Sequence, residues 1–400
     1  MEENILNDLL IKNYENLFAW CEARDFAGFD PFDGLNSRLF QATPLKNFAL
    51  ARLAWLQTIK RWPINLRLFL QVPPGTNSKG IALFALAELA RLRATKALEH
   101  EERAKFLLAK LLSLKIQNPR SKIQNHRAAF GYNFDWQSRA FFAPQNTPTI
   151  VPTAFAARAF VEGYELFKDE LYLNTAREIC EFIVKDLNRS AETESEICFS
   201  YTPLDRSIIF NASLLAGETL ASVGAIDKNE EWLTLAAKSA RFVLRRQLAN
   251  GAWAYGAKLR HKWIDNFHTA FILLSLSRLQ RLIPDLRAET QNALERGYQF
   301  WVDNFFLADG TPKYFNHKTY PIDVHSAAAA VVALCELTDL DKTAIKLAEK
   351  VMVWTTQNLR HEQGFFYYQK QRFYTNKIPF IRWGQAWTAF ALARILEVKR

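Results

Sequence analysis

The chain has 400 residues, of which 49% are hydrophobic and 23% charged, so it can bury a sizeable core and is not a disordered polymer. Its formal charge of +10 comes from Lys and Arg scattered among acidic residues, which argues against nucleic-acid binding. No apolar stretch approaches the roughly 20 residues of a membrane span. The acidic N-terminus lacks the basic and apolar regions of a signal peptide, so we expect a cytoplasmic protein without an integral membrane segment.

In chain order, a first helix is expected at about 4–22, followed by a polar loop. Beyond it, apolar residues at i, i+3 and i+4 predict six amphipathic outer helices, at roughly 45–61, 97–116, 172–188, 229–248, 286–306 and 342–358. The segments between them are more uniformly apolar and Ala-rich, as expected for inner helices packed on both sides. The pattern predicts one all-α domain over 1–400, an (α/α)6 toroid of six helical hairpins in 45–400, with an extra N-terminal helix and a mouth loop in 1–44.

A repeat of 57 to 60 residues supports the toroid. Three copies pair a Gly-led aromatic segment with a polar segment that opens an apolar helix: GAWAY with WIDNFHTA, GTPKY with YPIDVHSA, and GFFYY with IRWGQA. An earlier copy reads YTPLDR with FNA. Alignment of these copies places Asn211, His268, His325 and Gln385 at one structural position, and a step back of 58 residues reaches Thr153.

The long, polar loops all lead into inner helices, so we expect them at one end of the ring, which we call the mouth. Six helix N-termini that converge there favour an anionic ligand. Aromatic rings and polar groups in such a cup are typical of a carbohydrate site. The expected substrate-binding residues, with Lys79 beside them, are Asp30, Asp33, Asn36, Tyr132, Asp135, Arg139, Tyr201, Asp205, Arg206, Asn211, Trp253, Tyr255, Trp263, Lys313, Tyr314, His317, Tyr320, Tyr374, Lys377, Arg382, Trp383 and Gln385.

The candidate catalytic residues form two short motifs, Asp265-x-x-His268 and Asp323-x-His325. Histidine transfers protons near neutral pH, and a neighbouring carboxylate holds its tautomer and raises its basicity. The structural alternative is that both aspartates cap inner helices and the histidines only bond within the loop layer.

Neither a metal nor another cofactor is expected. The DxxH and DxH spacings are not recognised zinc motifs, although two His and two Asp are chemically able to bind zinc. The four cysteines, Cys21, Cys180, Cys198 and Cys335, show no CxxC pair or metal-ligand spacing.

Two other chemistries remain open from the residue types. A carboxylate pair drawn from the mouth aspartates suits glycoside hydrolysis, with Asp30, Asp33, Asp135, Asp205, Asp265 and Asp323 as its candidates. Tyr201, Tyr314 and Arg382 suit a uronate lyase, in which arginine neutralises a carboxylate and tyrosine or histidine moves the proton.

The chain resembles the α/α-toroid superfamily, which includes squalene-cyclase-like proteins, six-hairpin glycosidases, sugar 2-epimerases and lyases. The strings GFDPFDGLN, GYNFDWQSRAFF, WIDNFHT, PKYFNHKTYPIDVHSA and FYTNKIPFIRWGQAW resemble bacterial toroid proteins associated with surface-polysaccharide gene clusters. The terpene-cyclase motifs DDxxD and DxDD are missing, and so is the zinc-binding pattern of lanthionine cyclases. Fold analogy is therefore the limit of what these relatives imply.

Together, the residues and the resemblance predict a carbohydrate-active enzyme that uses acid–base chemistry on an acidic sugar or glycan intermediate of surface-polysaccharide metabolism. The expected reaction is that of an epimerase, an isomerase, with His268 and His325 transferring the proton. A hydrolase or lyase that uses the mouth aspartates is the first alternative. The second is a non-catalytic toroid that binds a glycan or a protein. The expected ligand is an anionic sugar or oligosaccharide.

Overall fold

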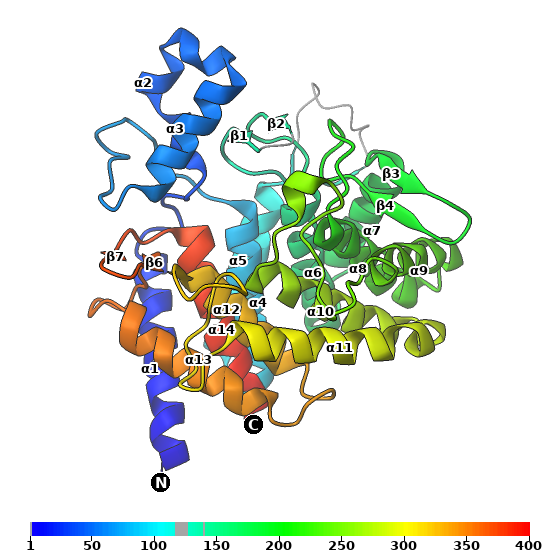
Figure 1. Ribbon diagram of the computed structural model, residues 1–400. Coiled ribbons are helices and arrows are strands. Elements are labelled where there is room, and N and C mark those ends of the chain that lie inside the picture. The colour runs from blue at the N-terminus through cyan, green and yellow to red at the C-terminus, as the bar shows by residue number, and fades with distance from the viewer. Residues whose placement is uncertain (1, 117–126, 139–140) are drawn as a thin grey trace.

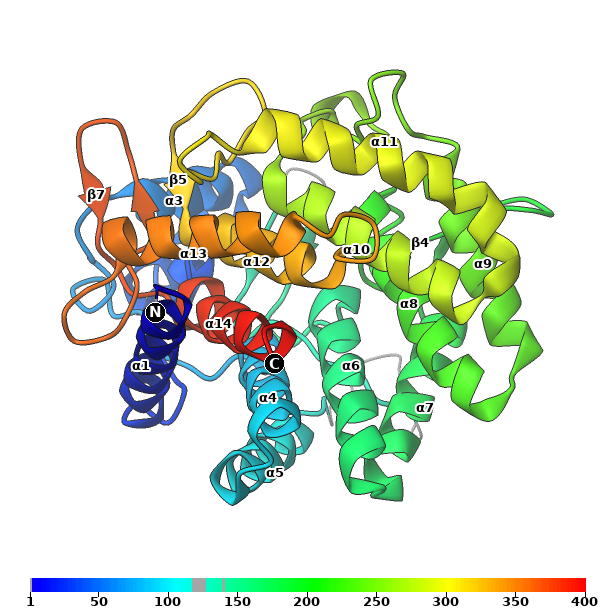
Figure 2. The same ribbon diagram turned by 90° about the horizontal axis from the view of Figure 1, so that it is seen from below.

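The computed structural model describes residues 2–116, 127–138 and 141–400 (Figure 1). Six inner helices pack side by side in a closed ring (Figure 2). In ring order, they are α4 (Ser78–Thr95), α6 (Ile150–Phe167), α8 (Phe210–Asp227), α10 (Asn266–Leu282), α12 (Val324–Glu336) and α14 (Ala386–Val398). Uniform burial explains their composition, since in α12 every residue from Val324 to Cys335 is buried.

Five amphipathic helices follow the first five inner helices and pack on their outer sides. They are α5 (Leu98–Ser113), α7 (Glu170–Lys185), α9 (Glu230–Leu244), α11 (Arg287–Phe305) and α13 (Ala344–Leu359). The sixth outer position, against α14, is taken by α1 (Glu2–Glu22). The predicted (α/α)6 toroid is therefore confirmed.

Two helices exchange the places that the sequence pattern assigned to them. Helix α1 is not an extra element but closes the outer ring. Helix α3 (Ala49–Arg61), expected as the outer helix 45–61, packs instead on η1 (Asp33–Asn36), η2 (Pro44–Asn47) and β1 (Trp136–Gln137). With α2 (Arg38–Gln41), it lies above the mouth (Figure 1). We call residues 33–74 the cap.

The glycines of the repeat show why α1 belongs to the outer ring. Gly251, Gly310 and Gly364 have φ angles of 88°, 88° and 99°, which L side chains rarely adopt. A Cβ on them would meet backbone atoms at 2.5, 2.7 and 2.8 Å, those of Arg296 in α11, Lys350 in α13 and Asn16 in α1. Each repeat therefore places its glycine against an outer helix, and α1 is the third of these helices.

A backbone hydrogen bond sets the register of the repeat. The first N–H of an inner element donates to a carbonyl in the next loop in five cases: Ile150 to Tyr201, Phe210 to Tyr255, Asn266 to Tyr314, Val324 to Tyr368 and Ile381 to Phe29. In this register, Asn211 and His325 are equivalent, as predicted. The prediction is wrong for His268, which lies one residue later, and for Gln385, since Arg382 occupies the equivalent position.

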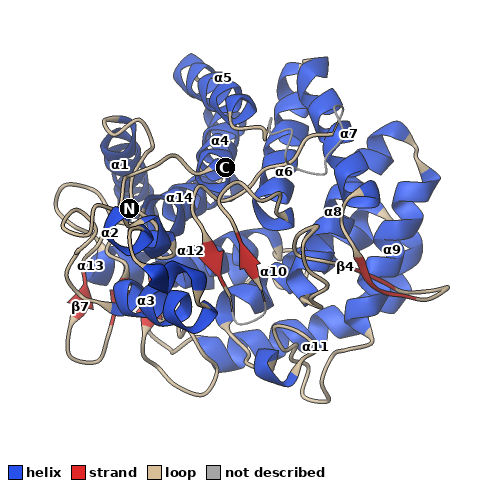
Figure 3. Cartoon of the chain, turned by 90° about the horizontal axis from the view of Figure 1, so that it is seen from above, coloured by secondary structure: helices blue, strands red, loops and turns tan. Residues whose placement is uncertain are grey.

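The short strands lie in the loops that lead into inner helices (Figure 3). All pair antiparallel: β1 with β2 (Phe142–Ala143), β3 (Arg189–Glu192) with β4 (Ile197–Phe199), and β6 (Gln369–Lys370) with both β5 (Ile322–Asp323) and β7 (Thr375–Asn376). The remaining short elements are η3 (Leu259–His261), η4 (Pro284–Leu286) and a π-helical turn, η5 (Ile381–Gln385), that leads into α14.

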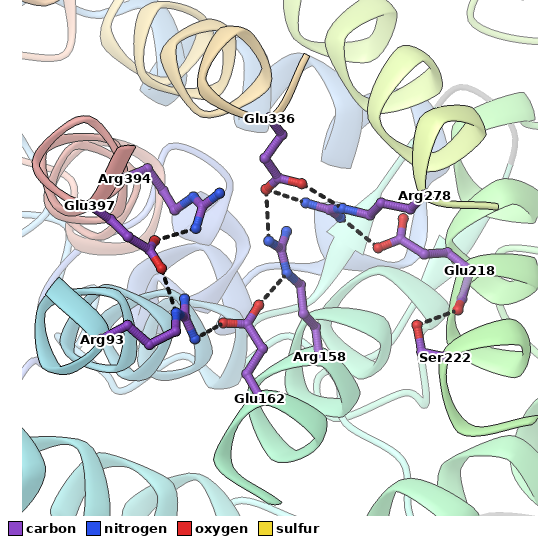
Figure 4. Close-up of polar contacts among 9 residues, drawn as sticks. All are labelled: Arg93, Arg158, Glu162, Glu218, Ser222, Arg278, Glu336, Arg394 and Glu397. Atoms are coloured by element: carbon purple, nitrogen blue, oxygen red, sulfur yellow. Dashed lines mark hydrogen bonds and ion pairs between the residues drawn. The ribbon is translucent and has the colours of Figure 1, made fainter. Parts of the chain in front are cut away.

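Below the mouth, a network of ion pairs spans the ring axis and links all six inner helices (Figure 4). Glu336 of α12 accepts from Arg158 of α6 at 2.8 Å and from Arg278 of α10 at 2.6 Å. Burial alone would raise the pKa of Glu336, but Arg278 and Arg158 outweigh it and hold that pKa well below its usual range. We call this region the closed end of the ring.

Within the described residues, no helix combines the length and the apolar character needed to cross a bilayer. All four cysteines are buried and none forms a disulfide.

Candidate active site

A cavity of about 450 Å³ lies at the mouth, between the ring and the cap. Every inner helix contributes to it the second residue after its N-cap: Lys79, Val151, Asn211, Phe267, His325 and Arg382. The N-termini therefore converge on one space, as predicted. Their first N–H groups are mostly paired with loop carbonyls, so the positive potential of the cavity comes mainly from side chains.

His268 and Asp265 form a hydrogen-bonded pair at the start of α10. Asp265 caps the helix by accepting from the backbone N–H of His268 at 3.0 Å, and its other oxygen lies 2.7 Å from His268 Nδ1. The indole N–H of Trp263 donates to the same oxygen at 2.9 Å. Asp265 is buried, whereas His268 is 18% exposed at the cavity wall. This geometry favours a proton on Nδ1 and leaves Nε2 as an acceptor.

His325 has different surroundings. It is 1% exposed, and neither ring nitrogen has a hydrogen-bond partner among the described residues. Its ring stacks on Trp383 at 4.2 Å between centroids. Burial, together with the charges of Lys79 and Arg382, lowers the pKa of His325 well below its usual value. The imidazole is therefore neutral at pH 7, and the hydrogen-bonding capacity of both buried nitrogens is unused among the described residues.

Asp323 is a buried cap rather than a cavity wall. One of its oxygens accepts from the N–H groups of His325 and Ser326, at 2.9 and 3.2 Å, and the other accepts from Gln369 at 2.6 Å. Burial raises its pKa to about 6. Asp323 holds the start of α12, and so positions His325 from behind.

Arg382 reaches the cavity from η5. It binds both carboxylate oxygens of Asp30, at 2.6 and 2.7 Å, and lies 5.2 Å from the ring of Tyr132. Asp33 holds the same loop through Arg67, at 2.6 Å. Asp30 and Asp33 therefore support Arg382 and do not line the cavity.

The amine of Lys79 lies over a set of aromatic rings, which we call the floor of the cavity. Its Nζ lies 4.4, 5.1 and 5.5 Å from the rings of Phe155, Trp387 and Phe271. The residue is 3% exposed, and burial lowers its pKa well below the usual value. An anion bound beside this buried amine would favour its protonated form, which the ring faces also stabilise.

The cap adds a second lysine. Lys60 Nζ of α3 lies 4.0 Å from the ring of Phe32 and 5.5 Å from that of Trp383. Burial lowers the pKa of Lys60 to about 8, although Asp323 and Asp30 act in the opposite direction. The cavity is therefore lined by three cationic groups with different proton affinities.

Aromatic rings form much of the remaining wall. Tyr255 stacks on Trp263 with centroids 4.5 Å apart and lies 4.5 Å from the ring of His268. Across the cavity, Tyr132 and Tyr201 place their hydroxyl oxygens 3.4 Å apart. Flat apolar faces beside hydroxyls and cations are suited to a sugar ring.

The structure brings together 12 of the 27 expected residues, counting Lys79. Those that line the cavity are Tyr132, Tyr201, Asn211, Tyr255, Trp263, Asp265, His268, Tyr314, His325, Arg382 and Trp383, with Lys79. Those placed outside it are Asp30, Asp33, Asn36, Asp135, Asp205, Arg206, Trp253, Lys313, His317, Tyr320, Asp323, Tyr374, Lys377 and Gln385. Arg139 lies outside the described residues.

Several of the residues outside the cavity organise loops. Asp205 accepts from Thr202 and Ser207, and Asn36 bonds the 133–135 segment. Gln385 binds the backbone of Phe366 through both amide atoms. Their polar groups are used within the fold, which sequence position alone does not indicate.

Sequence reasoning missed Lys60, the aromatic residues Phe32 and Phe134, and the ring of Phe267. In α3, Leu53, Gln57 and Lys60 line the cavity at helical spacing, whereas the sequence pattern predicts an outer helix at 45–61. Phe267 lies within the WIDNFHT motif and follows from the corrected register.

Among the described residues, no three His, Cys, Asp or Glu side chains come close enough together to hold a metal ion.

No protein-family model and no curated protein matches this chain. Several solved structures of other proteins do match the fold of this chain. A cellobiose 2-epimerase from Bacillus thermoamylovorans is 12% identical, with 80% of this chain and 87% of that chain covered and a TM-score of 0.62. A GH76 α-mannanase from Bacteroides thetaiotaomicron is 11% identical, with coverages of 82% and 87% and a TM-score of 0.60. An unsaturated glucuronyl hydrolase specific for heparin is 14% identical, with coverages of 80% and 86% and a TM-score of 0.56. At these identities, the likeness establishes the toroid fold alone.

Proposed function

We propose that this chain is a carbohydrate-active enzyme that moves a proton on an anionic sugar, with epimerisation as the leading reaction. One observation carries the proposal: the Asp265–His268 pair lies at the wall of a cavity that is lined by aromatic rings and cations. Solved structures of this fold that are named for an epimerase, a mannanase and a glucuronyl hydrolase support a sugar substrate.

The two histidines are proposed to have unequal roles. His268 Nε2 is the base, because Asp265 occupies Nδ1 and stabilises the imidazolium that forms. His325 is neutral and supplies a hydrogen bond or the second proton transfer. Both rings contact Phe267, at centroid distances of 4.0 and 4.6 Å, so one small ligand can reach both.

The cations support an acidic substrate. Lys79 and Arg382 come from the ring and Lys60 from the cap, and a carboxylate or phosphate placed between them would offset their charge. Among the described residues, Asp265 is the one acidic side chain that lines the cavity, and both of its oxygens accept hydrogen bonds. This arrangement favours proton transfer over hydrolysis by a carboxylate pair.

The finer assignment concerns place and pathway. We propose that the enzyme acts in the cytoplasm on an intermediate of surface-polysaccharide biosynthesis. The unpaired, buried cysteines are compatible with a reducing compartment, and the resemblance to proteins of polysaccharide gene clusters supports the substrate.

The test is incubation with a panel of uronic acids and nucleotide sugars in deuterated water, read by NMR. Deuterium at a sugar carbon without bond cleavage is the expected result, and new reducing ends or unsaturated products would instead indicate hydrolysis or elimination. His268→Gln should lower kcat by about 10²–10⁴-fold with an unchanged Tm. The matched control is His317→Gln, since His317 is an exposed loop histidine. Full activity of His268→Gln would disprove the assignment.

A further inference from the structure

The cap exposes an unusual concentration of large apolar side chains. Of the 21 such side chains that are exposed in the described residues, eight lie in the cap and two at the tip of the β6–β7 hairpin. Leu50 is 82% exposed, Phe69 79% and Phe373 88%. We call this set the docking face: Leu39, Leu45, Phe48, Leu50, Trp62, Ile64, Leu68, Phe69, Phe373 and Tyr374.

The docking face is distinct from the cavity wall. In α3, Leu53, Gln57 and Lys60 line the cavity, whereas Leu50, Thr58 and Arg61 are exposed and do not line it. Asn376 of β7 donates to the Trp62 carbonyl at 3.1 Å, so the hairpin is tied to the end of α3. Figure 1 shows the cap and the β6–β7 hairpin on the same side of the molecule.

The charge of these two segments has one sign. Between Asp33 and Glu88 the sequence contains seven basic residues and no acidic one. Between Glu362 and Glu397, which includes the hairpin, it contains five basic residues and again no acidic one. The exposed cations beside the docking face are Arg38, Lys46, Arg61, Arg372 and Lys377.

The combination of exposed apolar side chains and positive charge favours one kind of binding partner for the docking face. In an isologous dimer of two such faces, the basic residues of one copy would lie against those of the other. An anionic lipid surface instead offers negative headgroups to the cations and an apolar layer to Trp, Phe and Leu side chains. We propose that the docking face attaches this protein peripherally to an anionic lipid bilayer, without a spanning helix.

The test is co-sedimentation with vesicles of phosphatidylcholine, either alone or with about one third phosphatidylglycerol. We expect binding to the anionic vesicles, lost in high salt. The triple variant Leu68→Ser, Phe69→Ser and Phe373→Ser should weaken partitioning by roughly tenfold or more. The matched control is Leu171→Ser with Leu259→Ser, at sites that are 54% and 91% exposed and lie outside the cap and the hairpin.

A charge variant provides the second arm. Lys46→Gln with Arg61→Gln should weaken binding to the anionic vesicles by several-fold and reduce its salt dependence. Absence of vesicle binding, or equal binding by the triple and control variants, would overturn the proposal. So would a dimer that the triple variant dissociates in the absence of vesicle binding, because the occupant is then a second copy. Activity on a soluble sugar is measured separately, since none of these residues lines the cavity.

Discussion

The mouth and the closed end of the ring are built by the same six helices, yet they treat buried charge in opposite ways. At the closed end, four arginines and four glutamates alternate in one network: Arg93, Arg158, Arg278 and Arg394 with Glu162, Glu218, Glu336 and Glu397. Among the described residues at the mouth, three cations line the cavity beside a single acid, Asp265.

The helix dipole sharpens this contrast. Arg93 and Arg394 lie near helix C-termini, where a cation is favoured. Lys79 and Arg382 lie in first turns, where a cation is disfavoured. A charged residue that is unfavourable for the helix dipole and does not stabilise the fold indicates a functional role. The closed end therefore holds the ring together, and the mouth has the charge that the proposed anionic substrate requires.

The largest effect is expected at the closed end. Glu336→Gln leaves the guanidinium groups of Arg158 and Arg278 without their shared partner, which should cost about 3–5 kcal/mol in the free energy of unfolding. Urea denaturation measures this loss. Glu231→Gln, at an exposed site on α9, is the control. If Glu336→Gln alters kcat of the folded protein but not its stability, the division between the two ends is wrong.

Lys79→Met should separate function from stability at the mouth. The loss of one ionic contact should raise KM for an anionic sugar by roughly 10–100-fold. The Tm should stay the same or rise, because a buried cation is replaced by an apolar chain of similar length. Lys346→Met, on the exposed side of α13, is the control. A lower Tm with unchanged KM would assign Lys79 to the fold.

His325 predicts a pH dependence of stability. The folded pKa is lowered, so below about pH 6.5 the unfolded chain takes up a proton that the folded protein does not. The free energy of unfolding should therefore fall as the pH falls through 6.5. His325→Gln should lose about 1 kcal/mol less between pH 7.5 and 5.5. Parallel stability curves for the two proteins would contradict the buried, neutral imidazole.

Lys60 predicts the smallest change. Its pKa of about 8 means that its charge is lost as the pH rises through 8, so KM for an anionic sugar should increase a few-fold above that pH. Lys60→Arg keeps its charge and should give a flat profile of KM against pH. An identical rise in both proteins would assign the titration to another group.

The toroid fold could be predicted from the sequence, because helical periodicity and the repeat are local patterns. The sequence also identified the Asp265–His268 pair, which lies within four consecutive residues. It did not distinguish the roles of α1 and α3, because both are amphipathic and only the ring decides which one packs on α14. Lys60 reaches the cavity from the cap, a contact that depends on tertiary packing.

The register error has a physical cause as well. The last repeat contains the π-helical turn η5, which adds one residue between the cavity wall and the floor. Phe155 and Phe271 lie four residues after Val151 and Phe267, whereas Trp387 lies five after Arg382. This extra residue accounts for one of the three positions between Arg382 and Gln385, and alignment by residue type accounts for the others.

The ion pair between Asp30 and Arg382 joins residues 352 positions apart, and the one between Arg93 and Glu397 spans 304. Neither contact can form in a partial ring. Because α1 emerges from the ribosome long before α14, the side of α1 that packs on α14 must wait for almost the whole chain to be synthesised. The proposed anion site is therefore completed last during folding. A nascent chain that lacks α14 has most of its helices but not this site.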